Sequence, residues 1–201
     1  MQPADNPDNA LRISRTVPAT PEAVFAYWTR AELVSAWFGA AHGLTATTCR
    51  MTPQVGGRWA ITATGMEPLS RIHGAYHEVV PGKRLAFSYQ IDEVMLMSII
   101  SITLKRTSGG TELQLLQTGF PDRVTLEQHA LSWAQGMWLM DEIMVVTGGG
   151  IGPKWMCPED RPLTELADDI RLVRRRFEDD MAAVSGRRPF FDWPDDYALR
   201  Q

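Results

Sequence analysis

The sequence predicts an α+β protein in which an antiparallel sheet packs against one long helix. Three observations lead to this fold class. Between residues 45 and 118, six segments alternate apolar and polar residues and are separated by turn residues. A segment with the spacing of an amphipathic helix follows at 121–146, and one strand with two short helices precedes the sheet. Because consecutive strands joined by short turns pair antiparallel, the six strands are expected to form a meander.

The chain begins with a strand and a short helix. Residues 11–17 alternate in polarity, which predicts a strand with Leu11 and Arg15 on the same side. Thr20 is a favourable capping residue, and Pro21 suits the first helical position because its missing N–H costs nothing there. A helix is therefore expected to begin at Pro21.

A second short helix is predicted from the spacing of Thr29 and Glu32, which is that of a capping box. It is expected to run to about Trp37 and to end at Gly39, because glycine is the residue most common just after a helix end. Trp28 of the first helix is expected to face inward.

The meander is bounded by turn signals rich in glycine and proline. Its strands are expected at 45–51, 58–64, 71–79, 84–91, 95–105 and 112–118. Side chains of a strand alternate between the two faces of the sheet, so every second residue is expected to point inward. The best inward sets are Trp59 and Ile61, then Leu85, Phe87 and Tyr89, then Leu113, Leu115 and Gln117.

The long helix carries one apolar stripe. Its members are Leu126, Ala130, Trp133, Met137, Met140 and Met144. His129 and Asp141 flank the stripe on opposite sides. A face rich in methionine and tryptophan either fills a core or lines a pocket, and the two interpretations stay open at this point.

The composition excludes several classes of function. The 201 residues carry a formal net charge of −4 without a basic stripe suited to phosphates, which argues against nucleic-acid binding. Cys49 and Cys157 form neither a disulfide framework nor a metal motif, and no cofactor is expected. The N-terminus lacks a signal-peptide pattern and no apolar run is long enough to span a membrane, so a cytoplasmic protein is expected.

Several phrases of the sequence, in this order, resemble one protein family. They are ISRTVPATPEAVFAYWT, LVSAWFG, VGGRW, HGAYHEVVPGKRLAFSY, GGTELQLLQTGF and a closing HALSW. Together with the element order, they make about residues 10–146 similar to the Aha-type (heat-shock-protein activator homologue) branch of the START/SRPBCC superfamily. Two departures are present: Ser132 precedes Trp133 where the family has glycine, and the long helix does not end the chain.

The resemblance implies a helix-grip fold, in which a curved antiparallel sheet wraps a long C-terminal helix and leaves a cavity between them. Members of the superfamily bind apolar small molecules, and some relatives catalyse cyclisation, dehydration or condensation in that cavity. The eukaryotic namesake instead stimulates the ATPase of a chaperone.

The expected organisation has three parts: a disordered N-terminus at 1–9, a START/SRPBCC-like domain at 10–146 and a C-terminal extension at 147–201. The extension contains a glycine-rich connection, an amphipathic helix predicted at 162–185 and an aromatic tail. A single amphipathic helix needs a partner for its apolar stripe, and Leu131 and Trp138 point away from the core stripe. The extension is therefore expected to dock on its own domain or across a homodimer, as lid, dimer arm or core cover.

The candidate ligand-binding residues combine the inward positions of the sheet and helices with polar groups able to orient a ligand. They are Trp37, Trp59, Arg71, His73, Tyr76, Phe87, Tyr89, Met97, Leu115, Gln117, His129, Trp133, Met137 and Asp141. Their aromatic and methionine content suits a flat or polyketide-like apolar ligand. Gln117, polar among apolar neighbours, either hydrogen-bonds a loop backbone or anchors a polar atom of the ligand.

The strand histidines do not predict a metal site. His73 and His77 lie about 13 Å apart along a strand, too far to share an ion. Whether His73 or Tyr76 faces inward is open, because Gly74 is suited to a bulge.

Two groups on the long helix are candidates for proton transfer. His129 either acts as a general acid or base or packs on Trp133. Asp141 either has a raised pKa and a catalytic role or pairs with Arg58, Arg71 or the extension.

These features favour binding of a small, largely apolar molecule between sheet and long helix. The alternative is a cyclase or dehydratase type of enzyme that uses His129, Asp141 or His73 for proton transfer. A chaperone-activating role is a more distant alternative.

Overall fold

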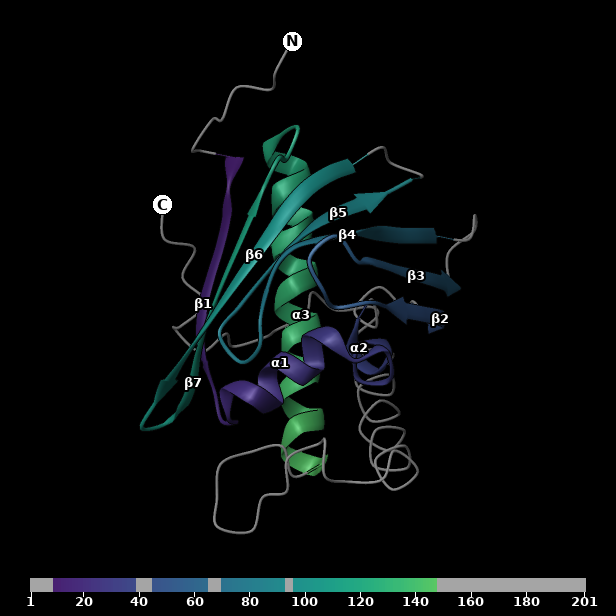
Figure 1. Cartoon of the computed structure of the whole chain (residues 1–201). Coiled ribbons are helices and arrows are strands. Elements are labelled where there is room, and N and C mark those ends of the chain that lie inside the picture. The colour runs from purple at the N-terminus through teal and green to yellow at the C-terminus, as the bar shows by residue number, and fades with distance from the viewer. Residues whose placement is uncertain (1–8, 39–44, 65–69, 93–95, 148–201) are drawn as a thin grey trace, which may run out of the picture.

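The computed structural model describes residues 9–38, 45–64, 70–92 and 96–147. They form a seven-stranded antiparallel sheet that curves around one long helix (Figure 1). The elements in chain order are β1 (Leu11–Val17), α1 (Pro21–Thr29), α2 (Ala31–Trp37), β2 (Thr45–Met51), β3 (Arg58–Thr64), β4 (Ser70–Val80), β5 (Arg84–Ile91), β6 (Leu96–Thr107), β7 (Gly110–Thr118) and α3 (Arg123–Thr147). This is the helix-grip fold that the sequence predicted.

The strands follow the order β1-β7-β6-β5-β4-β3-β2 across the sheet. Strands β2 to β7 therefore form the predicted meander, and β1 completes the sheet by pairing antiparallel with β7. Helices α1 and α2 lie across one end of the curved sheet, beside α3 (Figure 1). Contacts of α2 with β2 and of α1 with β6 and β7 connect these helices to both halves of the sheet.

The start of α1 is as predicted, whereas the start of α2 is not. Thr20 Oγ1 accepts a hydrogen bond from the Ala23 backbone N–H at 3.2 Å, with Pro21 in the first turn. The Thr29 hydroxyl instead donates to the Phe25 carbonyl at 2.8 Å, and Arg30 caps α2 without a side-chain hydrogen bond. The predicted capping box is wrong because α1 includes Thr29, whose hydroxyl bonds back into its own last turn.

The core lies between the concave face of the sheet and α3. The predicted stripe of α3 is buried at Leu126, Trp133, Met137, Met140 and Met144. Leu139 and Ile143 are buried as well, so the covered face of α3 is wider than one stripe. On β6 the inward phase contains Leu96 and Ser98, and Met97 points outward with 65% of its surface exposed. The expected inward orientation of Met97 is therefore wrong, because a strand shows adjacent residues to opposite faces.

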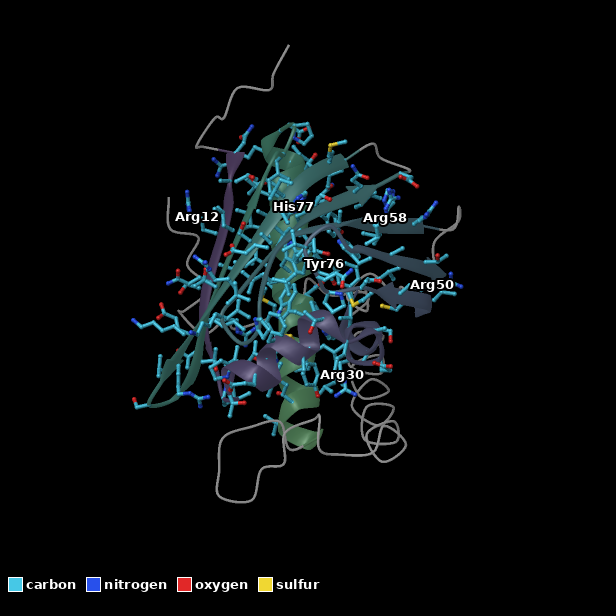
Figure 2. All side chains as sticks on the ribbon, viewed as in Figure 1. Arg12, Arg30, Arg50, Arg58, Tyr76 and His77 are labelled. Atoms are coloured by element: carbon cyan, nitrogen blue, oxygen red, sulfur yellow. The ribbon has the colours of Figure 1, made fainter. Side chains whose placement is uncertain are left out.

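A register shift in β4 lies between Tyr76 and Glu78. Ile72 and Tyr76, on the same phase of the strand before this shift, are buried, whereas His73 is partly exposed and His77 is exposed. Tyr76, not His73, is thus the inward residue. Tyr76 lies near the centre of the view, whereas Arg12 and Arg50 lie toward its left and right sides (Figure 2).

The N-terminus of α3 provides a pH-dependent test of this part of the fold. Asp122 Oδ1 accepts from the Thr125 N–H at 2.7 Å, and hydrogen bonds to Thr125 lower the pKa of Asp122 below its ordinary value of 3.8. Because the pKa of Asp122 is lower in the folded state than in the unfolded state, the ionised carboxylate stabilises the fold. This stabilisation is fully present above the unfolded-state pKa and is lost as the pH falls through the folded-state pKa. Asp122→Ala is therefore expected to lower the Tm at neutral pH, and this difference from the natural protein should narrow in acid.

Thermal unfolding of both proteins across this pH range measures the effect. Asp122→Asn is the control, because asparagine caps helices without a titrating charge. A difference between aspartate and alanine that stays constant with pH would contradict the role of the charged cap.

Candidate functional site

A small aromatic cavity of about 20 Å³ lies between the α1–α2 pair and the half of the sheet formed by β2 to β5. It is lined by Trp28, Val34, Trp37, Phe38, Met51, Trp59, Ile61, Tyr76 and Phe87. None of these residues belongs to α3. The sequence placed the cavity between the sheet and the long helix; the cavity lined by these residues instead lies under α1 and α2. Its volume is enough for about one water molecule.

The walls of the cavity are held by packing between aromatic rings. Trp28 meets Trp37 edge to face at 4.9 Å between ring centroids, and Trp59 meets Phe87 in the same way at 5.5 Å. Phe38 and Met51 are partly exposed, whereas the other lining side chains are buried. The cavity therefore reaches the surface beside Phe38 and Met51.

The indoles and the phenol of the lining differ in their hydrogen bonding. Trp37 Nε1 donates to the Tyr27 carbonyl at 2.9 Å, and Trp59 Nε1 donates to the Ser88 carbonyl at 3.1 Å. Trp28 Nε1 and the Tyr76 hydroxyl are buried and have no hydrogen-bond partner among the residues that the structure describes. Burial, and next the nearby Cys49, raise the pKa of Tyr76, so its hydroxyl stays protonated at physiological pH.

Gly74 explains how Trp59 reaches across β4. The side-chain oxygen of Ser88 accepts from the Ala75 N–H at 2.9 Å, and the Ser88 carbonyl accepts from the Trp59 indole. A Cβ on Gly74 would lie 1.8 Å from that carbonyl oxygen and 2.8 Å from Trp59 Nε1. The missing side chain of Gly74 therefore makes room for one wall of the cavity.

A buried polar network lies next to the cavity, where the ring of Trp133 packs 5.6 Å from that of Trp28. Trp133 Nε1 donates to Gln117 Oε1 at 2.7 Å, and Gln117 Nε2 donates to Ser98 Oγ at 2.9 Å. Both polar groups of Gln117 are thus engaged by core side chains, and not by the loop backbone that the sequence suggested.

Replacing Gln117 by leucine is expected to destabilise the protein by about 1–3 kcal/mol, because the buried Trp133 indole loses its acceptor. Denaturant unfolding measures the loss. Trp133→Phe should cost less in the Gln117→Leu background than in the natural protein, since the hydrogen bond is then already absent. Additive losses would show that the two side chains are not coupled.

His129 lies at the edge of this network. Its Nδ1–H donates to the Thr125 carbonyl at 2.9 Å, because a carbonyl can only accept. Its ring packs edge to face on Phe120 at 5.3 Å and on Tyr89 at 6.0 Å. The expected packing partner was Trp133, and the structure places Phe120 and Tyr89 there instead. His129 does not line the cavity.

The other titratable candidates lie away from the cavity as well. Asp141 pairs with Arg15 of β1, so the expected partners Arg58 and Arg71 are wrong. Arg15 projects from the inward phase of β1, between Leu11 and Val17, and meets α3 there. His73 Nε2 lies 2.7 Å from Asp92 Oδ1 on the outer side of the sheet.

The predicted ligand-binding residues thus fall into three groups. Those that line the cavity are Trp37, Trp59, Tyr76 and Phe87. Those buried in the adjoining core are Tyr89, Leu115, Gln117, Trp133 and Met137. Those outside both are Arg71, His73, Met97, His129 and Asp141.

Several lining residues were not among the predicted site residues. They are Trp28, Val34, Phe38, Met51 and Ile61. Trp28 and Ile61 were expected to point inward, but nothing local indicates that the inward face there is hollow. Met51 lies two residues after Cys49 on β2, so both side chains are on the same face of the strand. This alternation could have identified Met51 as a lining residue.

Cys49 lies on β2 beside the cavity, and the reactivity of its thiol measures how well this region is buried. Burial, and to a lesser degree Glu32, raise the pKa of the Cys49 thiol to about 11. Since the thiolate is the nucleophile, alkylation is expected to be slow at neutral pH and to accelerate up to about that pH. The chain has 2 cysteines, so Cys157→Ser leaves Cys49 alone for this measurement. An alkylation rate that levels off near the pKa of a free thiol would contradict the burial.

The outer face of α3 is apolar in part. Val124, Leu131 and Val145 are exposed, and the partly buried Trp138 lies midway between the last two. The extension predicted at 147–201 lies, after Thr147, outside the described residues, so its docking and a homodimer stay predictions. A cytoplasmic location stays a prediction as well. Within the described part of the chain, no helix is long and apolar enough to cross a membrane.

Comparisons with known proteins agree with this architecture. The family model described as Activator of Hsp90 ATPase homolog 1-like protein matches residues 18–144. A crystal structure from Chromobacterium violaceum is 26% identical, with a TM-score of 0.61, and covers 67% of this chain and 95% of its own. One from Rhodobacter sphaeroides is 27% identical, with a TM-score of 0.62, and covers 68% of this chain and 92% of its own.

A more distant structure shares the fold alone. DynU16, a protein in the dynemicin biosynthetic locus, is 19% identical, with a TM-score of 0.57, and covers 72% of this chain and 49% of its own. A search of curated proteins finds no match.

Proposed function

Because the chain belongs to the family of Activator of Hsp90 ATPase homolog 1-like proteins, the Aha-type branch of the START/SRPBCC superfamily, we propose that it binds a small, largely apolar molecule in the cavity under α1 and α2. The fold commonly binds hydrophobic ligands. The observation that carries the proposal is the lining: aromatic and aliphatic side chains from both helices and four strands, with no charged side chain among them.

The size of the cavity sets a condition on binding. Ligand pockets usually enclose about 300–1,000 Å³, whereas this cavity measures about 20 Å³. A ligand must therefore displace side chains as it enters. Met51 and Phe38 lie at the opening of the cavity. Because the methionine side chain is unbranched, Met51 can change its conformation at little cost in free energy.

The proposal is tested by blocking the opening. The natural protein, Met51→Trp and Met97→Trp are purified from the organism of origin and analysed by native mass spectrometry. Met97→Trp is the matched control, because Met97 lies on the outer face of β6 and 65% of its surface is exposed. A retained small molecule is expected in the natural protein and the control, and not in Met51→Trp. Equal retention by both variants, or no retained molecule in any of the three, would overturn the proposal.

The positions of the titratable groups favour binding over proton-transfer catalysis. An acid or base must come within hydrogen-bond reach of the group it serves. His73 is bonded to Asp92, Asp141 is paired with Arg15, and His129 lies beside Phe120; none of the three lines the cavity. Among the described residues, the cyclase or dehydratase alternative therefore has none of its three candidate acids or bases in this cavity.

A further inference from the structure

Two residues that line the cavity each carry a buried polar atom without a hydrogen-bond partner among the described residues. Trp28 is 4% exposed and Tyr76 is 2% exposed, and the Trp28 indole N–H and the Tyr76 hydroxyl are both buried. The residues come from α1 and β4, so only the tertiary fold brings them to one cavity. The other two indoles in the lining each bond a backbone carbonyl. Among the described residues that line the cavity, Trp28 and Tyr76 are therefore the two with an unsatisfied polar atom.

Burying such a group unsatisfied is unfavourable. A buried donor without an acceptor carries the cost of its lost hydration, and native proteins contain few such groups. Two of them in the wall of one cavity suggest that an acceptor entering the cavity would satisfy both. The phenol also stays protonated, because burial raises the pKa of Tyr76.

From this arrangement we infer that the ligand is a neutral aromatic molecule whose buried end carries an oxygen acceptor, such as an aryl ketone, held by Trp28 Nε1–H and the Tyr76 O–H. This inference rests on the proposed function and adds the chemical class of the ligand. The acceptor is neutral because no cationic side chain of the described residues lines the cavity, and an unpaired carboxylate would be costly to bury there. The aromatic body follows from the tryptophan, tyrosine and phenylalanine rings around it.

The test uses two probes of nearly the same shape: acetophenone, which has a C=O group, and α-methylstyrene, which has C=CH₂ in its place. Each is titrated into the full chain while the indole N–H resonances are followed by ¹H–¹⁵N NMR, with the Trp28 signal assigned from Trp28→Phe. Acetophenone is expected to bind about tenfold more tightly, as one or two net hydrogen bonds would give. It alone should move the Trp28 signal in the direction of a stronger hydrogen bond.

Tyr76→Phe removes one of the two donors and is expected to erase most of the preference for the ketone while α-methylstyrene still binds. Tyr27→Phe is the matched control: Tyr27 is a buried tyrosine next to Trp28 in sequence, and it does not line the cavity. If Tyr76→Phe does not fold, the Trp28 resonance in the natural protein decides the question by itself.

The outcomes separate the two proposals. Equal binding of both probes, with no selective movement of the Trp28 signal, would overturn the inferred acceptor and leave apolar binding in place. The inferred acceptor would also be overturned if Tyr27→Phe erased the preference for the ketone as fully as Tyr76→Phe does. If neither probe perturbs the residues lining the cavity, the inference fails together with the proposed function.

Discussion

Replacing Asp141 by alanine is expected to destabilise the protein by about 3–5 kcal/mol, the usual cost of removing one member of a buried ion pair. The side chains of Arg15 and Asp141 are 11% and 16% exposed, so the pair is largely withdrawn from water. It joins the first strand to the last turns of α3, where Met140 and Met144 are fully buried. Without the carboxylate, the guanidinium loses this partner while it stays largely withdrawn from water.

Denaturant unfolding of the variant measures this cost, and a second ion pair supplies the control. Arg84 and Glu78 form a surface pair with side chains 58% and 40% exposed, and such pairs contribute about 0–1 kcal/mol. Glu78→Ala should therefore have little effect. The double variant Arg15→Met, Asp141→Leu should lose less stability than Asp141→Ala, because no charge is left behind. Similar losses for Asp141→Ala and Glu78→Ala would refute the burial argument.

Replacing Gly74 by alanine is expected to cost about 3 kcal/mol, at the upper end of the range for overpacking. The new Cβ would lie 1.8 Å from the Ser88 carbonyl oxygen, and a backbone atom of a paired strand cannot yield as the end of a side chain can. Strands β4 and β5 would have to separate locally, and the hydrogen bond from Trp59 to Ser88 would be lost. The damage would therefore reach the wall of the cavity.

Gly109→Ala is the matched control, since its Cβ would meet only Thr16 Cγ2 at 3.9 Å, an ordinary contact. Unfolding in denaturant compares the two variants, and near-ultraviolet circular dichroism reports on the tryptophan packing. If Gly74→Ala were as stable as Gly109→Ala, the Ser88 carbonyl would not lie as close to Gly74 as described.

The inward and outward phases of most strands followed from the sequence because one face of each strand is covered and the other is not. Leu85, Phe87 and Tyr89 of β5 are buried as their alternation predicted. Met97 was misassigned because it neighbours an equally apolar Leu96, and a run of apolar residues does not show its own phase. The position of the β4 bulge was likewise undetermined, because Gly74 suits a bulge but in fact admits the Trp59 indole.

The candidate site was less predictable than the fold. Arg15 was expected on the same side of β1 as Leu11, and it lies there. Its partner Asp141 lies 126 positions further along the chain, and periodicity carries no information on which helix turn faces which strand. Gln117 was recognised as an unusual inward polar residue. That Trp133 and Ser98 satisfy it depends on how α3 lies on the sheet.

By itself, the sequence determined the elements, their order and the antiparallel meander, because periodicity, turn residues and capping are local properties of the chain. The helix-grip family followed from the resemblance of several phrases of the sequence to that family. Only the tertiary structure decided where the interior is hollow and which polar atoms there have no partner. A cavity is a mismatch of shapes between elements distant in the sequence, here α1 and α2 against β2 to β5. No segment of the chain contains that mismatch alone, so it appears only when the elements are packed together.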